Sequence, residues 1–324
     1  MAHVLIPQAE ACGYIGIGKY FMQITEILKY IEANVNSAFF YTPNFYKEGK
    51  SFLFKNPFQI LKARSKKEVG NVLSKVDELS QDPNIIGFSA IPYEIGYYFQ
   101  PKEIMNSYLE NTELCFYLYH KDEVEIIDSD DLQYDEIEKY FNAKNSITDF
   151  ELDITKNEYV DKIEKIKRYI AQGDTYQINF TTKAKFKFNG ELTSLFLNGI
   201  FNQSASYSVL INTESNFILS FSPELFFKID YKTIISKPMK GTLKRKANPN
   251  EDKNLVNLLL HDEKNLAENV ILLETNKNNF ITKIKNTFSE PYLSQILALL
   301  QRDKSIVNSY KELNSFLSRP GLLD

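Results

Sequence analysis

The 324-residue sequence has few of the residues that mark disulfide-rich, zinc-binding or triad-containing proteins. Its two cysteines, Cys12 and Cys115, make neither a disulfide framework nor a cysteine-rich zinc site, so we expect a cytosolic protein. Its three histidines, His3, His120 and His261, are far apart in sequence, and no G-x-S-x-G motif is present. A histidine-based zinc site and a Ser-His-Asp triad are therefore disfavoured, and any bound metal is expected to depend on carboxylates.

Long apolar runs and an excess of positive charge are absent as well. The longest apolar runs, such as IIGFSAI, fall far below the roughly 20 residues that a membrane span needs. The first residues, MAHVLIPQAEACGYIG, lack the basic region of a signal peptide. A net charge of -4 argues against a general nucleic-acid binder. The remaining composition, 43% hydrophobic and 25% charged, is typical of a folded globular protein whose partners are small molecules or proteins.

The first part of the sequence predicts both helices and strands. SKKEVGNVLSKVDELS (65–80) opens with a capping box of Ser65 and Glu68 and carries an apolar stripe, which predicts a helix packed on a core. IIGFSAI (85–91) predicts a buried strand, and ELCFYLYHKDEVEII (113–127) predicts a strand, a turn and a second strand.

An acidic stretch at residues 128–150 has weak periodicity, which is typical of a connector. We therefore expect an N-terminal region at 1–150 and a second region at 151–324. The length allows two such domains, and it also allows one large domain with extended sheets.

The second region begins with a helix. A capping box of Thr155 and Glu158 starts it, and Gly173 ends it. Its apolar stripe is expected to be buried, and consists of Val160, Ile163, Ile166 and Ile170. The alternating segment TYQINFTTKAKFKF (175–188) then predicts a strand with Gln177 and Asn179 on one face.

Further strands and helices are expected toward the end of the chain. SYSVLINTESNFILSFSPELFFKID (206–230) predicts several strands, with a turn at NTESN, and TIIS (233–236) predicts another. Helical patterns return from about Asn254. Near the other end, GYIGIGKY (13–20) has nearly the spacing of a phosphate-binding loop, but Tyr20 stands where a Ser or Thr should reach magnesium. A structural turn is favoured there.

Four motifs follow one another within residues 173–269: GDTYQINF, SFSPELFF, KPMKGT and DEKNLAEN. This ordered set resembles the chorismate-utilising enzymes, the family of anthranilate synthase component I, aminodeoxychorismate synthase component I and the isochorismate and salicylate synthases. NPFQILKARSKKEVGNVLSKVDEL and GFSAIPYEIGYYFQP also resemble the N-terminal region of its aminating members. The resemblance implies an α+β fold in which two large antiparallel sheets pack as a sandwich with helices outside.

Two positions separate the chemistries within this family. Where the water-adding members carry a lysine, this sequence has Gln177, as in members that add ammonia. Where anthranilate synthases usually carry alanine, it has Lys240. The resemblance thus narrows to aminodeoxychorismate synthase component I, which converts chorismate and ammonia to 4-amino-4-deoxychorismate for p-aminobenzoate and folate biosynthesis. Anthranilate synthase component I is the enzymatic alternative.

The resemblance implies a role for each matching residue. Lys240 is the nucleophile that adds to the ring, and Glu224 is the general acid that protonates the departing hydroxyl. Gln177 belongs to the substrate site, and Gly241 and Thr242 bind a substrate carboxylate.

The implied cofactor is Mg²⁺, held by Glu268, since this hard cation prefers oxygen ligands. A lysine amine is nucleophilic only when neutral. The cations Lys237, Lys244 and Arg245 are close to Lys240 in sequence, and are expected to lower its pKa. Neither cysteine lies in a G-x-C-x-G setting, so the resemblance implies a separate glutamine amidotransferase subunit, or free ammonia.

The last part of the sequence departs from the family pattern. VILLETNKNNFIT replaces a segment that normally reads V-D-L-x-R-N-D-x-G, with Asn279 at the second acid. The family's G-S-x-T-G-A-P-K stretch and the glycine-rich region after it do not occur. We therefore expect a C-terminally shortened member, which is either a truncated enzyme or a non-catalytic chorismate-binding relative.

Overall fold

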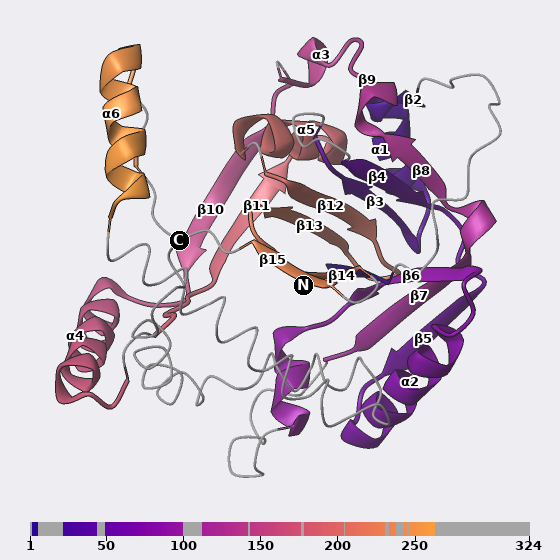
Figure 1. Ribbon diagram of the computed structural model, residues 1–324, viewed down its shortest axis with the longest axis horizontal. Coiled ribbons are helices and arrows are strands. Elements are labelled where there is room, and N and C mark those ends of the chain that lie inside the picture. Colours follow the sequence, from indigo (N-terminus) through magenta and orange to yellow (C-terminus); the bar gives the residue numbers. More distant parts are fainter. Residues whose placement is uncertain are drawn as a thin grey trace, which may run out of the picture.

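A computed structural model shows an α+β protein built around two antiparallel sheets (Figure 1). The structure describes residues 2–5, 22–43, 49–99, 112–141, 143–175, 178–203, 205–230, 233–237, 243–244 and 246–262.

The first sheet has four strands in the order β1-β6-β7-β5. Its strands are β1 (Ala2–Leu5), β5 (Gln59–Ala63), β6 (Ile85–Ala90) and β7 (Leu114–His120). Helix α2 (Lys66–Leu79) packs on its outer face, where Val69, Leu73 and Val76 lie beside Leu114 and Phe116. A 3-10 helix at Tyr93–Phe99 adds Ile95 and Tyr98 to the same cluster.

The second sheet has five strands in the order β13-β12-β3-β4-β8. Its strands are β3 (Ser37–Tyr41), β4 (Lys50–Phe54), β8 (Glu125–Asp128), β12 (Tyr207–Asn212) and β13 (Phe217–Ser222). Because β12 pairs with β3, this sheet joins strands from both sides of residue 150. The division into regions 1–150 and 151–324 stays a prediction.

The inner faces of the two sheets form a core rich in aromatic rings. Phe40 and Phe54 from the second sheet meet Phe88, Tyr117 and Tyr119 from the first. The ring centroid of Phe54 lies 5.2 Å from that of Phe88 and 5.0 Å from that of Tyr119. Burying each such side chain stabilises the fold by about 1.5–3 kcal/mol. The sandwich predicted from the sequence is confirmed.

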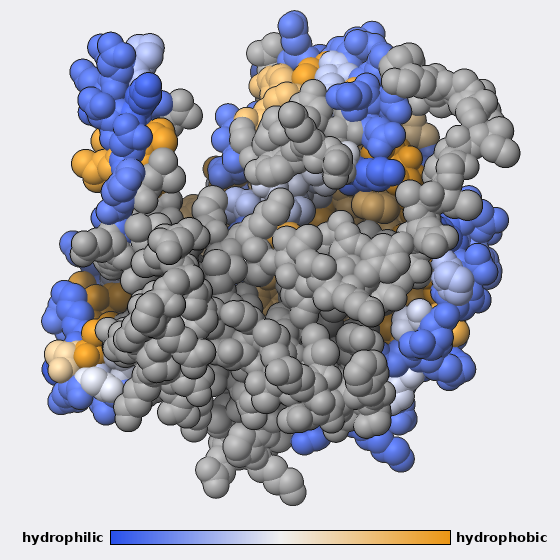
Figure 2. Space-filling model, viewed as in Figure 1, coloured by the Kyte–Doolittle hydropathy of each residue, from blue (hydrophilic) through white to orange (hydrophobic). Residues whose placement is uncertain are grey.

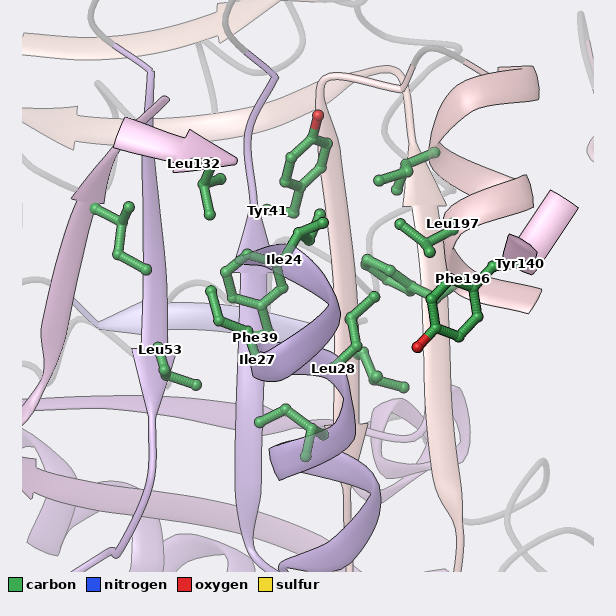
Figure 3. Close-up of a cluster of buried hydrophobic side chains, with 14 residues drawn as sticks. Ile24, Ile27, Leu28, Phe39, Tyr41, Leu53, Leu132, Tyr140, Phe196 and Leu197 are labelled. Atoms are coloured by element: carbon green, nitrogen blue, oxygen red, sulfur yellow. The ribbon is translucent and has the colours of Figure 1, made fainter. Parts of the chain in front are cut away.

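The outer face of the second sheet is covered by α1 (Ile24–Ala33) and α5 (Leu192–Gln203). Figure 3 shows Ile24, Ile27 and Leu28 of α1 pointing at Phe39 on β3, while Phe196 of α5 lies beside them. The molecule therefore has four layers: α2, the first sheet, the second sheet, and the pair α1 and α5.

Helix α2 begins where the sequence predicts. The Ser65 hydroxyl accepts the backbone N–H of Glu68 at 3.3 Å. The Glu68 carboxylate accepts the N–H of Arg64 at 2.7 Å, one residue before the position that a capping box would use. The apolar stripe is buried from Val69 to Val76, as expected.

The remaining elements are smaller. They are β2 (Met22–Gln23), β9 (Leu132–Gln133), α3 (Glu138–Phe141), β10 (Ser146–Leu152), α4 (Lys156–Gln172), β11 (Ala184–Asn189), β14 (Leu225–Asp230), β15 (Thr233–Lys237) and α6 (Pro249–Leu260). The stretch at 128–150, expected to be a connector, contains β9, α3 and the start of β10. Helix α6 begins five residues before Asn254, where the side chain of Asn248 caps it.

The predicted burial of α4 is wrong. The helix has the expected capping box at Thr155 and ends at Gly173, whose φ of 80° is left-handed. However, none of its residues is buried: Val160 is 47% exposed and Ile170 is 42% exposed. Figure 2 shows apolar side chains at the surface over α4 and α6. A stripe with helical spacing predicts a helix, but burial also requires a neighbouring element to cover it.

The predicted strand at 175–188 is correct only over its last five residues. Residues 184–189 form β11, which pairs with β10, whereas the described residues 178–183 are not strand. The Asp153 carboxylate accepts hydrogen bonds from the Thr182 hydroxyl and, at 2.9 Å, from the Lys183 N–H. These side-chain bonds hold residues 182 and 183 beside the end of the β10–β11 ladder, and β11 itself begins at Ala184. Among the helices that the structure describes, none is long and apolar enough to cross a membrane.

Candidate active site

Glu224 is the predicted site residue that the structure describes. It lies half-buried in the short connection between β13 and β14. Strand β14 pairs antiparallel with β15, and the register places Leu225 opposite Lys237. Glu224 is thus at the end of this hairpin where β15 finishes and the KPMKGT segment begins.

The register of β13 is fixed before the chain reaches Glu224. Strands β12 and β13 pair from Asn212 opposite Phe217 to Tyr207 opposite Ser222. In the turn between them, the Thr213 N–H donates to the Asn216 carbonyl at 2.9 Å. Pro223 follows the last paired residue, and its lack of an N–H ends the ladder there. Glu224 therefore leaves the sheet at a defined position.

Two residues that the sequence did not single out contact this segment from α5 and its C-terminal end. The ring of Phe221 occupies the space that a Cβ at Gly199 would need. The buried Ser206 hydroxyl donates to the Pro223 carbonyl at 3.4 Å. A glycine within an apolar helix is the signal that could have pointed to the first contact.

The other predicted site residues lie outside the described residues. These are Gln177, Lys240, Gly241, Thr242 and Glu268, and the loop at 13–20 does so too. The described chain stops two residues before Gln177, at Thr175, and resumes after Thr242 at Leu243 and Lys244, both exposed. The roles of these residues stay predictions.

No metal site appears in the part of the chain that the structure describes: no three His, Cys, Asp or Glu residues gather there. The donor set for Mg²⁺ implied by the sequence is Glu268, which lies beyond Asp262, the last described residue. A single carboxylate is a hard oxygen ligand of the kind Mg²⁺ takes, but it leaves most of the octahedral shell to water or substrate.

Two other groups could be mistaken for nucleophiles. Burial, with the nearby Glu113 carboxylate, raises the pKa of the Cys115 thiol to about 12. The hydrogen bond from Lys62 to the Glu214 carboxylate, 2.6 Å long, raises the pKa of that lysine. Both shifts favour the unreactive protonated form, so neither residue is a nucleophile at neutral pH.

A hollow of about 680 Å³ lies between β9 and α3, lined by residues 134–138 and Phe141. Phe201 of α5 stands edge-on to Tyr134 and Phe141, with ring centroids 5.9 and 5.3 Å away. Glu224, the predicted site residue that the structure describes, does not line this hollow. The hollow is therefore separate from the β13–β14 connection that carries Glu224.

Residues 37–298 match the family described as chorismate binding enzyme. Over 132 residues, the chain is 30% identical to aminodeoxychorismate synthase component 1 of Escherichia coli, a match that covers 41% of this chain and 29% of that protein. Over 143 residues, it is 31% identical to anthranilate synthase component 1 of Aquifex aeolicus, covering 44% of this chain and 28% of that one. The matched stretches thus span under a third of these relatives.

The fold also matches a solved structure. A putative 2,3-dihydroxybenzoate-specific isochorismate synthase from Bacillus anthracis superposes with a TM-score of 0.54 at 18% identity. The match covers 80% of this chain and 63% of that one. The likeness shows that the two chains share a fold.

Proposed function

Because the chain belongs to the chorismate binding enzyme family, we propose that it is an aminodeoxychorismate synthase component I, which replaces the C4 hydroxyl of chorismate by an amine. The match over residues 37–298 supports an enzyme that acts on chorismate. The choice of amination at C4 depends on Gln177 and Lys240, and the Escherichia coli relative supports it.

The observation that carries the proposal is the register of the β14–β15 hairpin. Leu225 faces Lys237, so Glu224 stands beside the strand end from which the chain continues to Lys240. Lys240 is the third residue after Lys237, so the chain between them spans at most about 11 Å. The chain is therefore short enough for the proposed acid and the proposed nucleophile to serve one substrate site.

The proposed reaction has two steps. The neutral Lys240 amine forms a bond to C2 of the ring, the double bonds shift, and the C4–oxygen bond breaks as Glu224 protonates the oxygen, which leaves as water. Ammonia then bonds to C4, the C2–nitrogen bond breaks to release the neutral Lys240 amine, and the proton lost by the new C4 ammonium group returns to the Glu224 carboxylate. The net change converts chorismate and ammonia to 4-amino-4-deoxychorismate and water.

Several other parts of the proposal follow from the same family. Gly241 and Thr242 bind a substrate carboxylate, and Glu268 would hold a Mg²⁺ ion, which would supply positive charge opposite the substrate carboxylates. A separate glutamine amidotransferase supplies the ammonia, in keeping with the term component 1 in the names of the relatives. A cytosolic location, expected from the two cysteines, belongs to this proposal too.

The test is to incubate the full chain with chorismate, Mg²⁺ and ammonium and to follow 4-amino-4-deoxychorismate by chromatography. Glu224→Gln should lower kcat by about 10²–10⁴-fold, the usual contribution of a positioned acid–base group, and Lys240→Ala, which removes the nucleophile, should lower it at least as much. Lys75→Ala, on the exposed side of α2, is the matched control and should retain full activity.

Two results would contradict the proposal in different ways. Release of anthranilate and pyruvate that survives Lys240→Ala would favour anthranilate synthase, which the Aquifex aeolicus relative makes the second candidate. Binding of chorismate without any product would assign the chain to the non-catalytic alternative.

A further inference from the structure

Helix α5 contacts the segment that carries Glu224 within the sheet, through Phe221. Phe221, three residues before Glu224, places its ring directly over Gly199. The same ring packs on Phe196, one turn earlier on the helix, with centroids 5.5 Å apart. A Cβ at Gly199 would overlap the ring, so this close approach requires glycine.

A second contact lies beyond the last paired residue of β13. Ser206 is 3% exposed, and its hydroxyl donates to the Pro223 carbonyl at 3.4 Å. That carbonyl belongs to the peptide group joining Pro223 to Glu224. Because a peptide group is planar, fixing its carbonyl also fixes the direction in which the Glu224 backbone starts.

Helix α5 is itself held firmly. Phe196 and Leu197 are fully buried. The Ser194 hydroxyl donates to the Tyr140 carbonyl at 2.5 Å, and the Thr193 hydroxyl donates to the Glu32 carboxylate on α1 at 2.9 Å. A contact with this helix is therefore a contact with a fixed part of the molecule.

We propose that Gly199 and Ser206 are positioning residues that set where the Glu224 carboxylate lies. The chemical task of Glu224 rests on the proposed function, whereas its position rests on these contacts alone. Neither residue touches the reacting atoms. Gly199 acts through the Phe221 ring, and Ser206 acts through the Pro223 carbonyl.

The kinetic test compares Gly199→Ala and Ser206→Ala with the unmodified full chain. A general acid acts only within hydrogen-bond reach of its proton acceptor, and a displacement of about 1 Å can cost about 10²-fold in rate. We expect kcat to fall at least tenfold in each variant, with the KM for chorismate within twofold of the original. A loss through poor folding would instead lower the active fraction and the melting temperature.

Matched variants separate positioning from general damage. Gly70→Ala places a methyl group on a helix with nothing within 4 Å, and Ser37→Ala removes a buried hydroxyl that donates to the Asn34 carbonyl at 2.6 Å. Both should leave kcat unchanged. A Gly199→Ala, Phe221→Leu double variant replaces the ring by a smaller side chain and should restore kcat. Ser206→Thr keeps the hydroxyl and should retain the original kcat.

A second measurement does not depend on any enzyme activity. In a Glu224→Cys chain, the rate at which a thiol reagent labels position 224 is measured by peptide mass spectrometry. Adding Gly199→Ala or Ser206→Ala should change that rate more than threefold, while Gly70→Ala and Ser37→Ala should not. If the unmodified chain does not aminate chorismate, the proposed function fails, and the labelling rates still decide the positioning. Unchanged rates in both variants would overturn it.

Discussion

Cys115 illustrates how the sandwich changes the chemistry of a side chain. It lies on β7 with 8% of its surface exposed, and its thiol donates to the Glu113 carboxylate at 3.4 Å. Burial and the nearby negative charge both oppose formation of a thiolate and raise its pKa to about 12. The thiol behaves as a small apolar side chain.

Alkylation of Cys115 should therefore be slow in the folded chain. At pH 8, a pKa of about 12 leaves about 10³-fold less thiolate than the ordinary cysteine pKa of about 8.5. Iodoacetamide labelling, followed by peptide mass spectrometry, should show at least that ratio between folded and urea-unfolded chains. Labelling of the folded chain at a rate near the unfolded one would contradict the burial of this side chain.

At the same scale, the sequence indicates candidate catalytic residues more readily than the residues that would position them. Glu224 could be proposed as the general acid because it stands in an SPE motif with a known order of neighbouring motifs. Gly199 and Ser206 could not be found in this way, because their importance depends on Phe221 and Pro223, which reach them only once α5 lies on the second sheet. Contacts between side chains distant in sequence leave little local pattern.

At the scale of elements, α2 and α4 have similar apolar stripes, but only the stripe of α2 is buried. Both have a capped first turn and apolar residues at helical spacing. Helix α2 lies against the first sheet, where Leu73 is 2% exposed, whereas none of the residues of α4 is buried. Periodicity could predict both helices, but which helix is covered depends on the sheet order, and the order is set by distant pairing.

Alanine substitutions should reveal this difference. Leu73→Ala should lower the free energy of unfolding by about 2–5 kcal/mol, as removal of a buried leucine usually does. Ile163→Ala on α4 should lower it by less than about 1 kcal/mol, since that side chain is only half-buried. Urea titrations followed by circular dichroism give both values. Equal losses would mean that the α4 stripe is covered in solution.

At the scale of the whole molecule, several buried hydroxyls make the fold sensitive to alkali. Burial is the largest cause that raises the pKa of Tyr41, Tyr117 and Tyr119. Their unfolded pKa values are near 10, and that of Cys115 is near 8.5. Above those values the unfolded chain loses protons that the folded chain keeps, so the free energy of unfolding falls as the pH rises.

The predicted loss begins near pH 8.5, steepens above pH 10, and amounts to about 1.4 kcal/mol per pH unit for each fully responding group. Urea titrations between pH 7 and 11 measure it. Tyr119→Phe removes the hydroxyl that donates to the Asn36 carbonyl at 2.9 Å, and should flatten the slope above pH 10. A constant free energy of unfolding up to pH 11 would refute the prediction.

The architecture as a whole was predictable because several motifs in order indicate a family, and the family indicates two packed sheets. The placing of individual strands was not. The pairing of β12 with β3 joins residues 207–212 to residues 37–41, and no local pattern encodes such a partner.

That pairing has a consequence for synthesis on the ribosome. Strand β12 lies in the middle of the second sheet, between β3 and β13, although β3 and β4 are made far earlier. At 5–20 residues per second, the interval between the end of β4 and the end of β12 lasts about 8–32 s. Until β12 is made, β3 has an open edge, and until α5 is made, Phe39 lacks that helix beside it. The nascent chain therefore requires protection from neighbouring nascent chains until α5 and β12 emerge.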